Sequence, residues 1–423
     1  MSSKKFLCII LALLLAVFAL SGCGGSSGVP STTPDQEQTV PDQPGDDSNE
    51  DTNEETDSTS NEIITVTESD THAIYHTGSS SSGTYSNVTI YKSGAASSSS
   101  ENADFYGTNA AVLSSNGATL TLKDSYVSTD AKYANAVFAY GGTVNVSNTT
   151  IKTYSSNSGG IMTTGGGTMN ASDLTITTSG NSAAAIRSDR GGGTVTVDGG
   201  TYTTSGTGSP VIYCTAAITV SGADLESKAS EGVVIEGGNS VTLDQCNLTA
   251  NHSKLNGQDT SYHGIMIYQS GSGDASDGTG TFSMTDSSLI NQKGAVFFTT
   301  HTTAIINLEN SEITNNDSDN IFLNSAKAAW GNGAAVTLNA TNQDITGDIT
   351  IDSTSSLNLN LKSSSTFTGA INKSLTTTGG TVAVNIASGC TWTLTGDSYV
   401  SSFTNNGTVN NAGYTLYLNG VAQ

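Results

Sequence analysis

A short segment of alternating β-branched and polar residues recurs eight times between residues 119 and 315. The steps between successive segments are 24, 25, 26, 23, 23, 41 and 24 residues, so all but one are nearly equal. The segments read TLTLKDSYVST, TVNVSNTTIKT, TMNASDLTITT, TVTVDGGTYTT, AITVSGADLES, SVTLDQCNLTA, TFSMTDSSLIN and IINLENSEITN. A repeat this regular requires one structural unit that stacks on copies of itself.

Each repeat contains three short stretches with period-two alternation, separated by two to four turn-forming residues. Such alternation predicts strands, and such short connections predict sharp corners rather than helices. In TVTV, Val195 and Val197 point to one side and Thr194 and Thr196 to the other. Three strands per repeat close only as one turn of a coil. The sequence therefore predicts an all-β chain, a single-stranded parallel β-helix (a solenoid) of roughly 13 rungs with three short strands per rung and no useful helix.

The N-terminal residues lack this pattern and are typical of an export signal. Lys4 and Lys5 precede an apolar run that ends at Leu20. The stretch LSGC that ends at Cys23 resembles the lipobox of bacterial lipoproteins, which implies cleavage before Cys23 and diacylglycerol on its thiol. The alternative is an ordinary signal peptide with an incidental cysteine. We expect a lipoprotein signal peptide over residues 1–22.

The following segment is acidic and poor in large apolar residues. Residues 24–62 carry eleven acidic side chains and no basic one, a composition typical of an extended, disordered segment. We therefore expect a lipid-anchored acidic stalk over residues 23–62, and a parallel β-helix domain with a C-terminal cap over residues 63–423.

Charge and cysteine content exclude several classes of protein. The net charge is −23, of which −14 falls on residues 63–423 once the signal and stalk are set aside. Such a domain is a poor partner for nucleic acid or anionic lipid surfaces. Cys214, Cys246 and Cys390 are widely spaced and odd in number, which fits buried apolar residues better than disulfides or a metal pattern.

From about residue 85 to 420 the chain resembles the right-handed parallel β-helix superfamily, which includes pectate lyases, polygalacturonases and bacterial surface adhesins. The stretches FYGTNAAVLSSNGATLTL, RGGGTVTVDGG, GSPVIYCT, VIEGGNSVTL and MIYQSGSGDA resemble, more narrowly, exported bacterial β-helix proteins of unassigned activity. This resemblance implies an architecture and no reaction.

The motifs of the superfamily's enzymes are mostly missing. The Asp-Asp pair, Asp46 and Asp47, lies in the predicted stalk. YHG, at residues 262–264, matches two of the three residues of the polygalacturonase histidine motif, and the Arg-Ile-Lys stretch is absent. A lyase would need a basic residue as its base, helped by calcium on aspartates. Arg187 or Arg190 would be that base.

Asp189, Asp274 and Asp277 would supply the oxygen ligands for that calcium, but their spacing does not match a known calcium loop. We therefore expect no cofactor, with calcium as the alternative. For Arg190 we expect a local charge-assisted bond with Asp189 that fixes a glycine-rich corner.

A column of outward-facing residues on the first strand of each repeat is the most unusual surface feature. Its expected members are Met162, Arg187, Tyr213, Ile235 and Met266. Such a column would present an aromatic face and a guanidinium to an extended glycan. The alternative is that loops around residues 251–261 and 269–280 cover it, so that these side chains are packing.

Several other polar or aromatic residues carry weaker signals. His252 and His263 by themselves predict loop histidines rather than a metal site, and Glu231 and Glu236 read as surface charge rather than a glycosidase pair. Trp330 and Trp392 are expected to anchor corners near the C-terminal end. The alternating Thr and Asn residues on the second strands fit plain strand propensity better than ice binding. The residues proposed for binding are Arg187, Tyr213, Met266, Tyr268, Asp189 and His263; none is proposed as a metal ligand.

These observations predict a lipid-anchored protein of the bacterial cell envelope that lies outside the cytoplasm. Its expected partners are a glycan, or the surface of a host or neighbouring cell, and the bilayer through Cys23. We expect a non-catalytic adhesin or glycan-binding protein. The alternative is a polysaccharide lyase or glycoside hydrolase that acts on an acidic polysaccharide.

Overall fold

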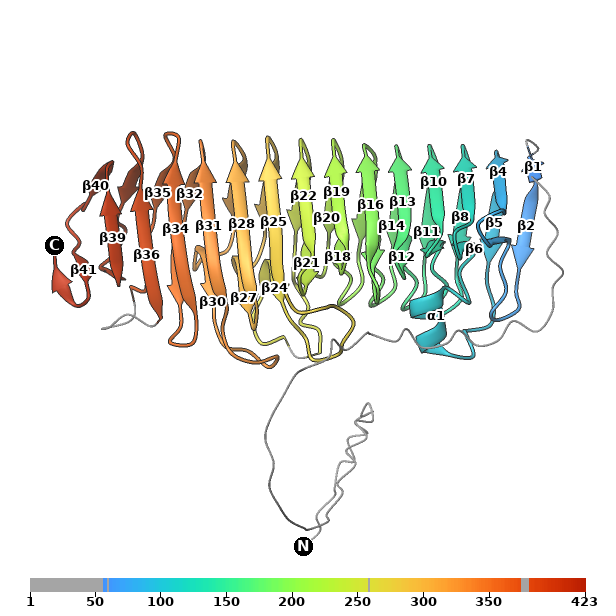
Figure 1. The fold of residues 1–423 in the computed structure, drawn as a ribbon, viewed down its shortest axis with the longest axis horizontal. Coiled ribbons are helices and arrows are strands. Elements are labelled where there is room, and N and C mark those ends of the chain that lie inside the picture. Colours follow the sequence, from blue (N-terminus) through green and yellow to red (C-terminus); the bar gives the residue numbers. More distant parts are fainter. Residues whose placement is uncertain (1–55, 59–60, 258, 374–379) are drawn as a thin grey trace, which may run out of the picture. The chain divides into compact units, whose positions relative to one another are not determined.

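The computed structural model describes residues 56–58, 61–257, 259–373 and 380–423 (Figure 1). The expected signal peptide, Cys23 and most of the expected stalk lie outside these residues. Within the described residues, no helix has the length and hydropathy needed to cross a bilayer.

Three parallel sheets form most of the β-helix, and successive rungs contribute one strand to each. We name them sheet A, sheet B and sheet C. Their strands pair in sequence order, each with its counterpart one rung away. The predicted parallel β-helix with three strands per rung is therefore confirmed.

Sheet A contains fourteen strands: β1 (Thr56–Ser58), β4 (Ser82–Ser86), β7 (Thr119–Lys123), β10 (Thr143–Ser147), β13 (Gly167–Ser172), β16 (Gly193–Asp198), β19 (Ala217–Ser221), β22 (Ser240–Asp244), β25 (Thr279–Thr285), β28 (Thr303–Glu309), β31 (Ala335–Thr341), β34 (Ser356–Lys362), β36 (Thr381–Ile386) and β39 (Ser402–Asn405). Sheet B contains ten: β2 (Ile63–Val66), β5 (Thr89–Lys92), β8 (Tyr126–Thr129), β11 (Thr150–Thr153), β14 (Thr175–Thr178), β17 (Thr201–Thr204), β20 (Asp224–Ser227), β23 (Asn247–Ala250), β26 (Ser288–Asn291) and β29 (Glu312–Asn315). Sheet C contains eleven: β3 (Ile74–Thr77), β6 (Val112–Ser115), β9 (Val137–Tyr140), β12 (Ile161–Thr164), β15 (Ile186–Ser188), β18 (Ile212–Cys214), β21 (Val233–Glu236), β24 (His263–Tyr268), β27 (Ala295–Thr300), β30 (Ile321–Ser325) and β33 (Asp348–Ile351).

Two smaller sheets complete the C-terminal rungs. Their strands are β32 (Asp344–Thr346), β35 (Thr366–Thr368), β37 (Thr391–Thr393) and β40 (Thr408–Asn410) in one, and β38 (Ser398–Val400), β41 (Leu416–Leu418) and β42 (Val421–Ala422) in the other. The last strand, β42, turns back antiparallel on β41 and so occupies an edge that a further rung would otherwise use.

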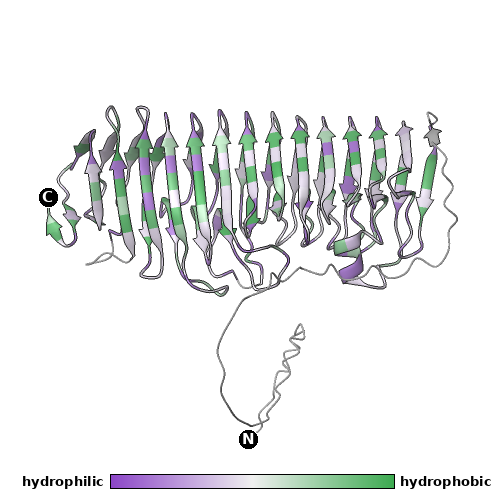
Figure 2. Cartoon of the chain, viewed as in Figure 1, coloured by the Kyte–Doolittle hydropathy of each residue, from purple (hydrophilic) through white to green (hydrophobic). Residues whose placement is uncertain are grey.

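The interior is built from apolar side chains that stack in register from rung to rung. In sheet A, one column runs from Leu120 through Val144 and Met169 to Val195, and each of these residues is at most 1 % exposed. Burial of each such side chain contributes about 1.5–3 kcal/mol. Figure 2 shows the alternation of apolar and polar residues along these strands that produces the column. Cys214, Cys246 and Cys390 are free and buried, as predicted.

The corner between sheets A and B has the same left-handed backbone conformation in successive rungs. At the same place in successive rungs, Asn148 and Asp173 have φ of 44° and 50°, and Gly199 has φ of 68°. Only glycine, and to a lesser degree Asn and Asp, adopt this left-handed conformation readily. The SNTT, SDL and DGG signals of the repeats are thus the residues that let the chain turn sharply.

Within the described residues one short helix lies between the strands, a seven-residue element that the sequence did not predict. Helix α1 (Ser100–Tyr106) has Ser99 as its N-cap, which accepts a hydrogen bond from the backbone N–H of Asn102. Gly107 ends it with φ of 72°. Seven residues are too few to show a helical period, so only the Ser and Gly caps signalled it.

Candidate functional site

The outward column of sheet C is the site that the sequence singled out, and most of its predicted register is correct. Met162, Arg187 and Tyr213 occupy equivalent positions on β12, β15 and β18. The next member is Val234, not Ile235, because Tyr213 pairs with Val234 while Ile235 pairs with Cys214 and points into the core. The prediction for Ile235 is wrong by one residue, since the three-residue GVV stretch gives no signal of which valine faces inward.

Apolar members of this column are buried although they lie on the outside of the coil. Met162 is fully buried with Phe138 and Leu113. Farther along, Val234, Met266 and Phe298 form a second cluster, and each of these side chains is 3–6 % exposed. Tyr213, Tyr268 and Trp330 pack against this cluster. The predicted open groove is therefore absent along this part of sheet C, and the alternative, packing beneath a cover, holds.

The cover has several parts, and the sequence predicted only some of them. Helix α1 packs over β9 and β12 through the edge-to-face contact of Tyr106 with Tyr140, 5.2 Å between ring centroids, and through the bond from the Thr164 hydroxyl to the Phe105 carbonyl. The loop after β24 and the loop at residues 326–333 cover the other end, where Trp330 contacts Tyr268 edge-on. Trp330 thus covers sheet C rather than a corner near the C-terminal end, whereas Trp392 stacks on Phe367 in the interior.

Arg187 is held by two carboxylates beneath α1. Its guanidinium is 2.7 Å from an oxygen of Asp189 and 3.3 Å from an oxygen of Asp104, and its side chain is 13 % exposed. Burial works against the charged guanidinium, but the two carboxylates outweigh it and raise the pKa of Arg187 further above its usual range. Burial also raises the pKa of Asp104 and of Asp189, with the guanidinium opposing it. The charge is satisfied locally, so Arg187 has no free face for a ligand or a proton transfer.

The guanidinium of Arg190 does not bind Asp189, contrary to the prediction. The side chain pairs with Asp274 at 2.9 Å and Glu101 at 3.3 Å and lies over the Phe105 ring, 3.9 Å from its centroid. Its contact with Asp189 is made by the backbone N–H. Both arginines therefore tie covering segments to sheet C. Asp189 and Asp274, two of the aspartates weighed as calcium ligands, are the carboxylates that bind these arginines.

Glu236 joins the aromatic residues of this column into a buried network. The carboxylate is 1 % exposed and accepts hydrogen bonds from the hydroxyls of Tyr213 at 2.5 Å and Tyr268 at 2.9 Å, and from that of Ser270. Burial, followed by the neighbouring Tyr268 and then Glu236, raises the pKa of Tyr213. Burial, followed by Glu236, raises the pKa of Tyr268. The interpretation of Glu236 as surface charge is wrong, because the loop after β24 folds over it.

His263 and its neighbours form a second buried group at the start of β24. His252 and His263 are 0 % and 1 % exposed, and Glu231 is 4 % exposed. The ring centroids of His252 and His263 are 4.8 Å apart, and the His263 ring also stacks on Phe298. The prediction is wrong for His263, which opens β24, and for Glu231, which is buried rather than on the surface; His252 lies in the loop before β24 as predicted, but it is buried there. The sequence offered no spacing signal because the three residues come from different rungs. Glu231 lies 3.3 Å from His263.

Electrostatic interactions within this group oppose the effect of burial on the pKa of Glu231. Burial alone would raise the pKa of Glu231, but the two imidazoles outweigh it and lower that pKa to about 2. Burial lowers the pKa of His252.

The outer face of sheet A differs, because nothing covers it in the described residues. One outward column is made only of hydroxyl and amide side chains, all exposed or half-buried, at one residue per rung: Thr84, Thr121, Asn145, Asn170, Thr196, Thr219, Thr242, Ser283, Asn307, Asn339, Asn360, Asn385 and Thr404.

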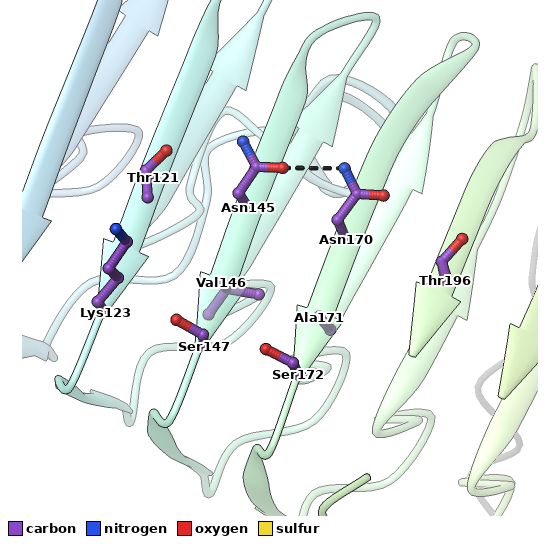
Figure 3. Close-up of a pocket in the computed structure, with 9 residues that line it drawn as sticks. All are labelled: Thr121, Lys123, Asn145, Val146, Ser147, Asn170, Ala171, Ser172 and Thr196. Carbon is purple, nitrogen blue, oxygen red and sulfur yellow. Dashed lines mark hydrogen bonds between the residues drawn. The ribbon is translucent and has the colours of Figure 1, made fainter. Parts of the chain in front are cut away.

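Neighbouring amides in this column, which we name the amide column, bind one another. Asn170 donates to Asn145 at 2.9 Å, and Asn339 and Asn360 extend a similar chain at 2.9 and 3.0 Å nearer the C-terminal end. Figure 3 shows Asn145 and Asn170 side by side, with Thr121 and Thr196 on the flanking strands, along a shallow hollow that Lys123 also lines. Each amide thus has a fixed orientation and repeats at the rung spacing.

Comparisons with known proteins assign the chain to no family. No protein-family model and no curated protein matches the chain. Among solved structures, a chain in the cryo-EM structure of the Vag8–C1 inhibitor complex is similar over 82 % of this chain and 94 % of its own, with 14 % sequence identity and a TM-score of 0.39.

Proposed function

We propose that the protein is a non-catalytic adhesin or glycan-binding protein and that the outer face of sheet A is the surface that holds the glycan. The observation that carries this proposal is the amide column, an uninterrupted row of hydroxyl and amide groups at one residue per rung. A polysaccharide presents hydroxyl groups at regular intervals, and each can exchange a water hydrogen bond for one to this row. Many weak contacts along one polymer add up to useful avidity.

The state of the residues weighed for catalysis supports binding over catalysis. Arg187 is paired with two carboxylates under α1, and Glu236 is shared by two tyrosines and a serine. A base must reach the proton that it removes, and neither group is open to a polymer in this arrangement. Tyr213 and Met266, proposed from the sequence as glycan contacts, act as packing here, and the glycan surface moves to the amide column.

The location stays a proposal drawn from the sequence. The LSGC stretch supports a lipid anchor on Cys23 in the bacterial cell envelope, outside the cytoplasm, and the acidic segment supports a spacer between the anchor and the β-helix. Growth of the producing cells with a labelled fatty acid tests it. Label in the protein that Cys23→Ala abolishes is expected, and equal labelling of both would refute the anchor.

The binding proposal is tested by affinity electrophoresis of the full chain in gels that contain acidic or neutral polysaccharides, with and without calcium. The triple variant Asn307→Ala/Asn339→Ala/Asn360→Ala is expected to lose most of the retardation. The matched control is Asn247→Ala, an exposed asparagine of sheet B that bonds to Asp224. Equal retardation of the triple variant and the control would remove the amide column from the proposal.

The same samples are followed for unsaturated products by ultraviolet absorbance and for new reducing ends. No product is expected. Product that Arg187→Ala abolishes would overturn the proposal in favour of a polysaccharide lyase or glycoside hydrolase at sheet C.

A further inference from the structure

Three residues from different parts of the chain converge in the interior at the corner between sheets B and C. Glu231 precedes β21, His252 follows β23, and His263 opens β24 one rung farther along. The two histidines are eleven positions apart and bracket the first of the two loops that make one repeat step longer than the others. The fold thus gathers two imidazoles and one carboxylate where the sequence shows no cluster.

The facing atoms of these side chains have the spacing of ligands around one ion. Oε1 of Glu231 is 3.3 Å from Nε2 of His263 and 3.8 Å from Nδ1 of His252, and one ligand atom from each residue lies within 4.8 Å of the others. Nδ1 of His252 accepts a hydrogen bond from the backbone N–H of His263 at 3.3 Å, which a bond to the ion would replace. Bonds of about 2.0–2.1 Å in a tetrahedral site hold neighbouring ligand atoms about 3.4 Å apart. Side-chain shifts of about 1 Å would bring all three into that geometry.

Unpaired polar atoms at this place require an explanation. Nε2 of His252 and both ring nitrogens of His263 are buried without a hydrogen-bond partner among the described residues. The 3.3 Å contact between His263 and Glu231 does not meet hydrogen-bond geometry, so the ring nitrogen is not aimed straight at the carboxylate oxygen. An unpaired buried polar group costs about 1–3 kcal/mol. A shared ion beside the line between the two atoms removes this cost for Nε2 of His263.

A second layer of contacts fixes the orientation of the three side chains. The hydroxyl of Ser230 donates to Oε2 of Glu231, which leaves Oε1 for an ion. Asp259 Oδ2 lies 3.8 Å from Nε2 of His252, on the ring edge away from Glu231, and its side chain is 7 % exposed. Phe298 stacks on His263. A carboxylate behind a ligating histidine and an apolar wall are recurrent supports of metal sites.

We propose that Glu231, His252 and His263 form a site for a divalent transition-metal ion of the zinc type. The two imidazole nitrogens favour zinc and its neighbours over calcium or magnesium, which prefer oxygen-only ligand sets. Three protein ligands leave one position of a tetrahedral ion for water. This ion differs from the calcium that a lyase would use, and the proposal does not depend on glycan binding.

The position of the site gives the ion a structural role. His252 and His263 lie at the two ends of the inserted loop, and Glu231 belongs to the preceding rung. An ion bound to all three closes the loop at its base and clamps it to the β-helix, because each ligand comes from a separate segment. The ion therefore stabilises a rung whose connection is lengthened by this loop.

Metal binding to the full chain, purified without a histidine tag and dialysed against EDTA, tests the proposal. Zinc is titrated against a coloured competing chelator, and bound metal is measured by mass spectrometry. One equivalent is expected. Glu231→Gln and His263→Gln should each weaken binding at least about 100-fold, and Asp259→Asn about 10-fold, since supporting residues typically contribute 10–100-fold. His76→Gln, at β3, is the matched control and should bind as the original chain does.

Trypsin gives a second readout that involves neither glycan nor activity. Lys254 is exposed in the clamped loop, and Lys327 is exposed in the separate loop over sheet C. Zinc should slow cleavage after Lys254 about 10-fold and leave cleavage after Lys327 unchanged, because only the first loop is coupled to the ion. Cobalt bound in place of zinc should show the visible bands of four-coordination.

Two results would overturn the proposal. One is an original chain that retains no more zinc than the double variant His252→Gln/His263→Gln. The other is protection of Lys254 that persists in Glu231→Gln. Circular dichroism of each variant identifies loss of fold, and the original chain and Asp259→Asn decide the question if the ligand variants do not fold.

Discussion

The outer faces of sheet A and sheet C come from the same rungs and the same alternation, yet they have opposite characters. On sheet A the outward positions carry Thr, Ser and Asn and stay open to solvent, as at Asn145 and Thr196. On sheet C the outward positions of β12, β21, β24 and β27 carry Met162, Val234, Met266 and Phe298, which are buried. Inserted segments lie over sheet C, and none of the described segments covers sheet A. The insertions, rather than the repeat, decide which face can meet a partner.

The largest difference between the faces should appear when a covered charge loses its partner. Arg187→Ala leaves Asp104 and Asp189 facing each other beneath α1, and it should lower the free energy of unfolding by about 3–5 kcal/mol. Arg190→Ala should cost about 1 kcal/mol or less, since its side chain is 34 % exposed. Urea unfolding followed by tryptophan fluorescence measures both. Equal costs would mean that α1 does not seal sheet C.

Apolar truncation compares the two faces directly. Phe298→Ala removes a ring that packs with Met266 and Val234 and should cost about 3 kcal/mol. Thr219→Ala, at an exposed outward position of sheet A, should change the free energy of unfolding by less than about 0.5 kcal/mol. Thermal unfolding of the two variants and the original chain checks this. A large effect of Thr219→Ala would indicate that sheet A is also covered.

Acidification should lower the free energy of unfolding through His72, a histidine beside sheet C. His72 precedes β3, and its Nδ1 lies 2.7 Å from the carbonyl of Ala110. Burial lowers the pKa of His72 to about 4 from 6.5, so the unfolded chain takes up a proton before the folded chain does. Its contribution to stability is complete above pH 6.5 and is lost as the pH falls toward 4. The loss should be roughly 1–2 kcal/mol, given its partial exposure. His72→Asn should flatten the pH profile of the unfolding midpoint over this window, and an unchanged profile would contradict it.

The smallest effect concerns the amide column. Asn339→Ala removes a bond to Asn307 and another from Asn360, both at half-buried positions, and should cost about 0.5–1 kcal/mol. A double-mutant cycle with Asn360→Ala should give a coupling energy below about 1 kcal/mol. A coupling of several kcal/mol would make the amide column part of the scaffold and weaken its role as a binding surface.

Architecture was largely predictable from the sequence, because a β-helix is specified by local alternation and a constant step. The inward positions of Val195 and Val197 follow from period two, and the left-handed corners at Asn148 and Gly199 follow from residue type. The parity of Val234 against Ile235 was not predictable, since a run of β-branched apolar residues has no alternation to read.

The sequence by itself determined the coil, its three strands per rung, the buried cysteines and the polar row on sheet A, because each depends on residues close in the chain or one repeat apart. Only the tertiary structure decided that Arg187 meets Asp104, that Glu236 is sealed by Tyr213 and Tyr268, and that Glu231, His252 and His263 converge. These contacts join insertions of different length to distant rungs. No local pattern encodes where such an insertion comes to rest; the packing of its side chains against the coil does.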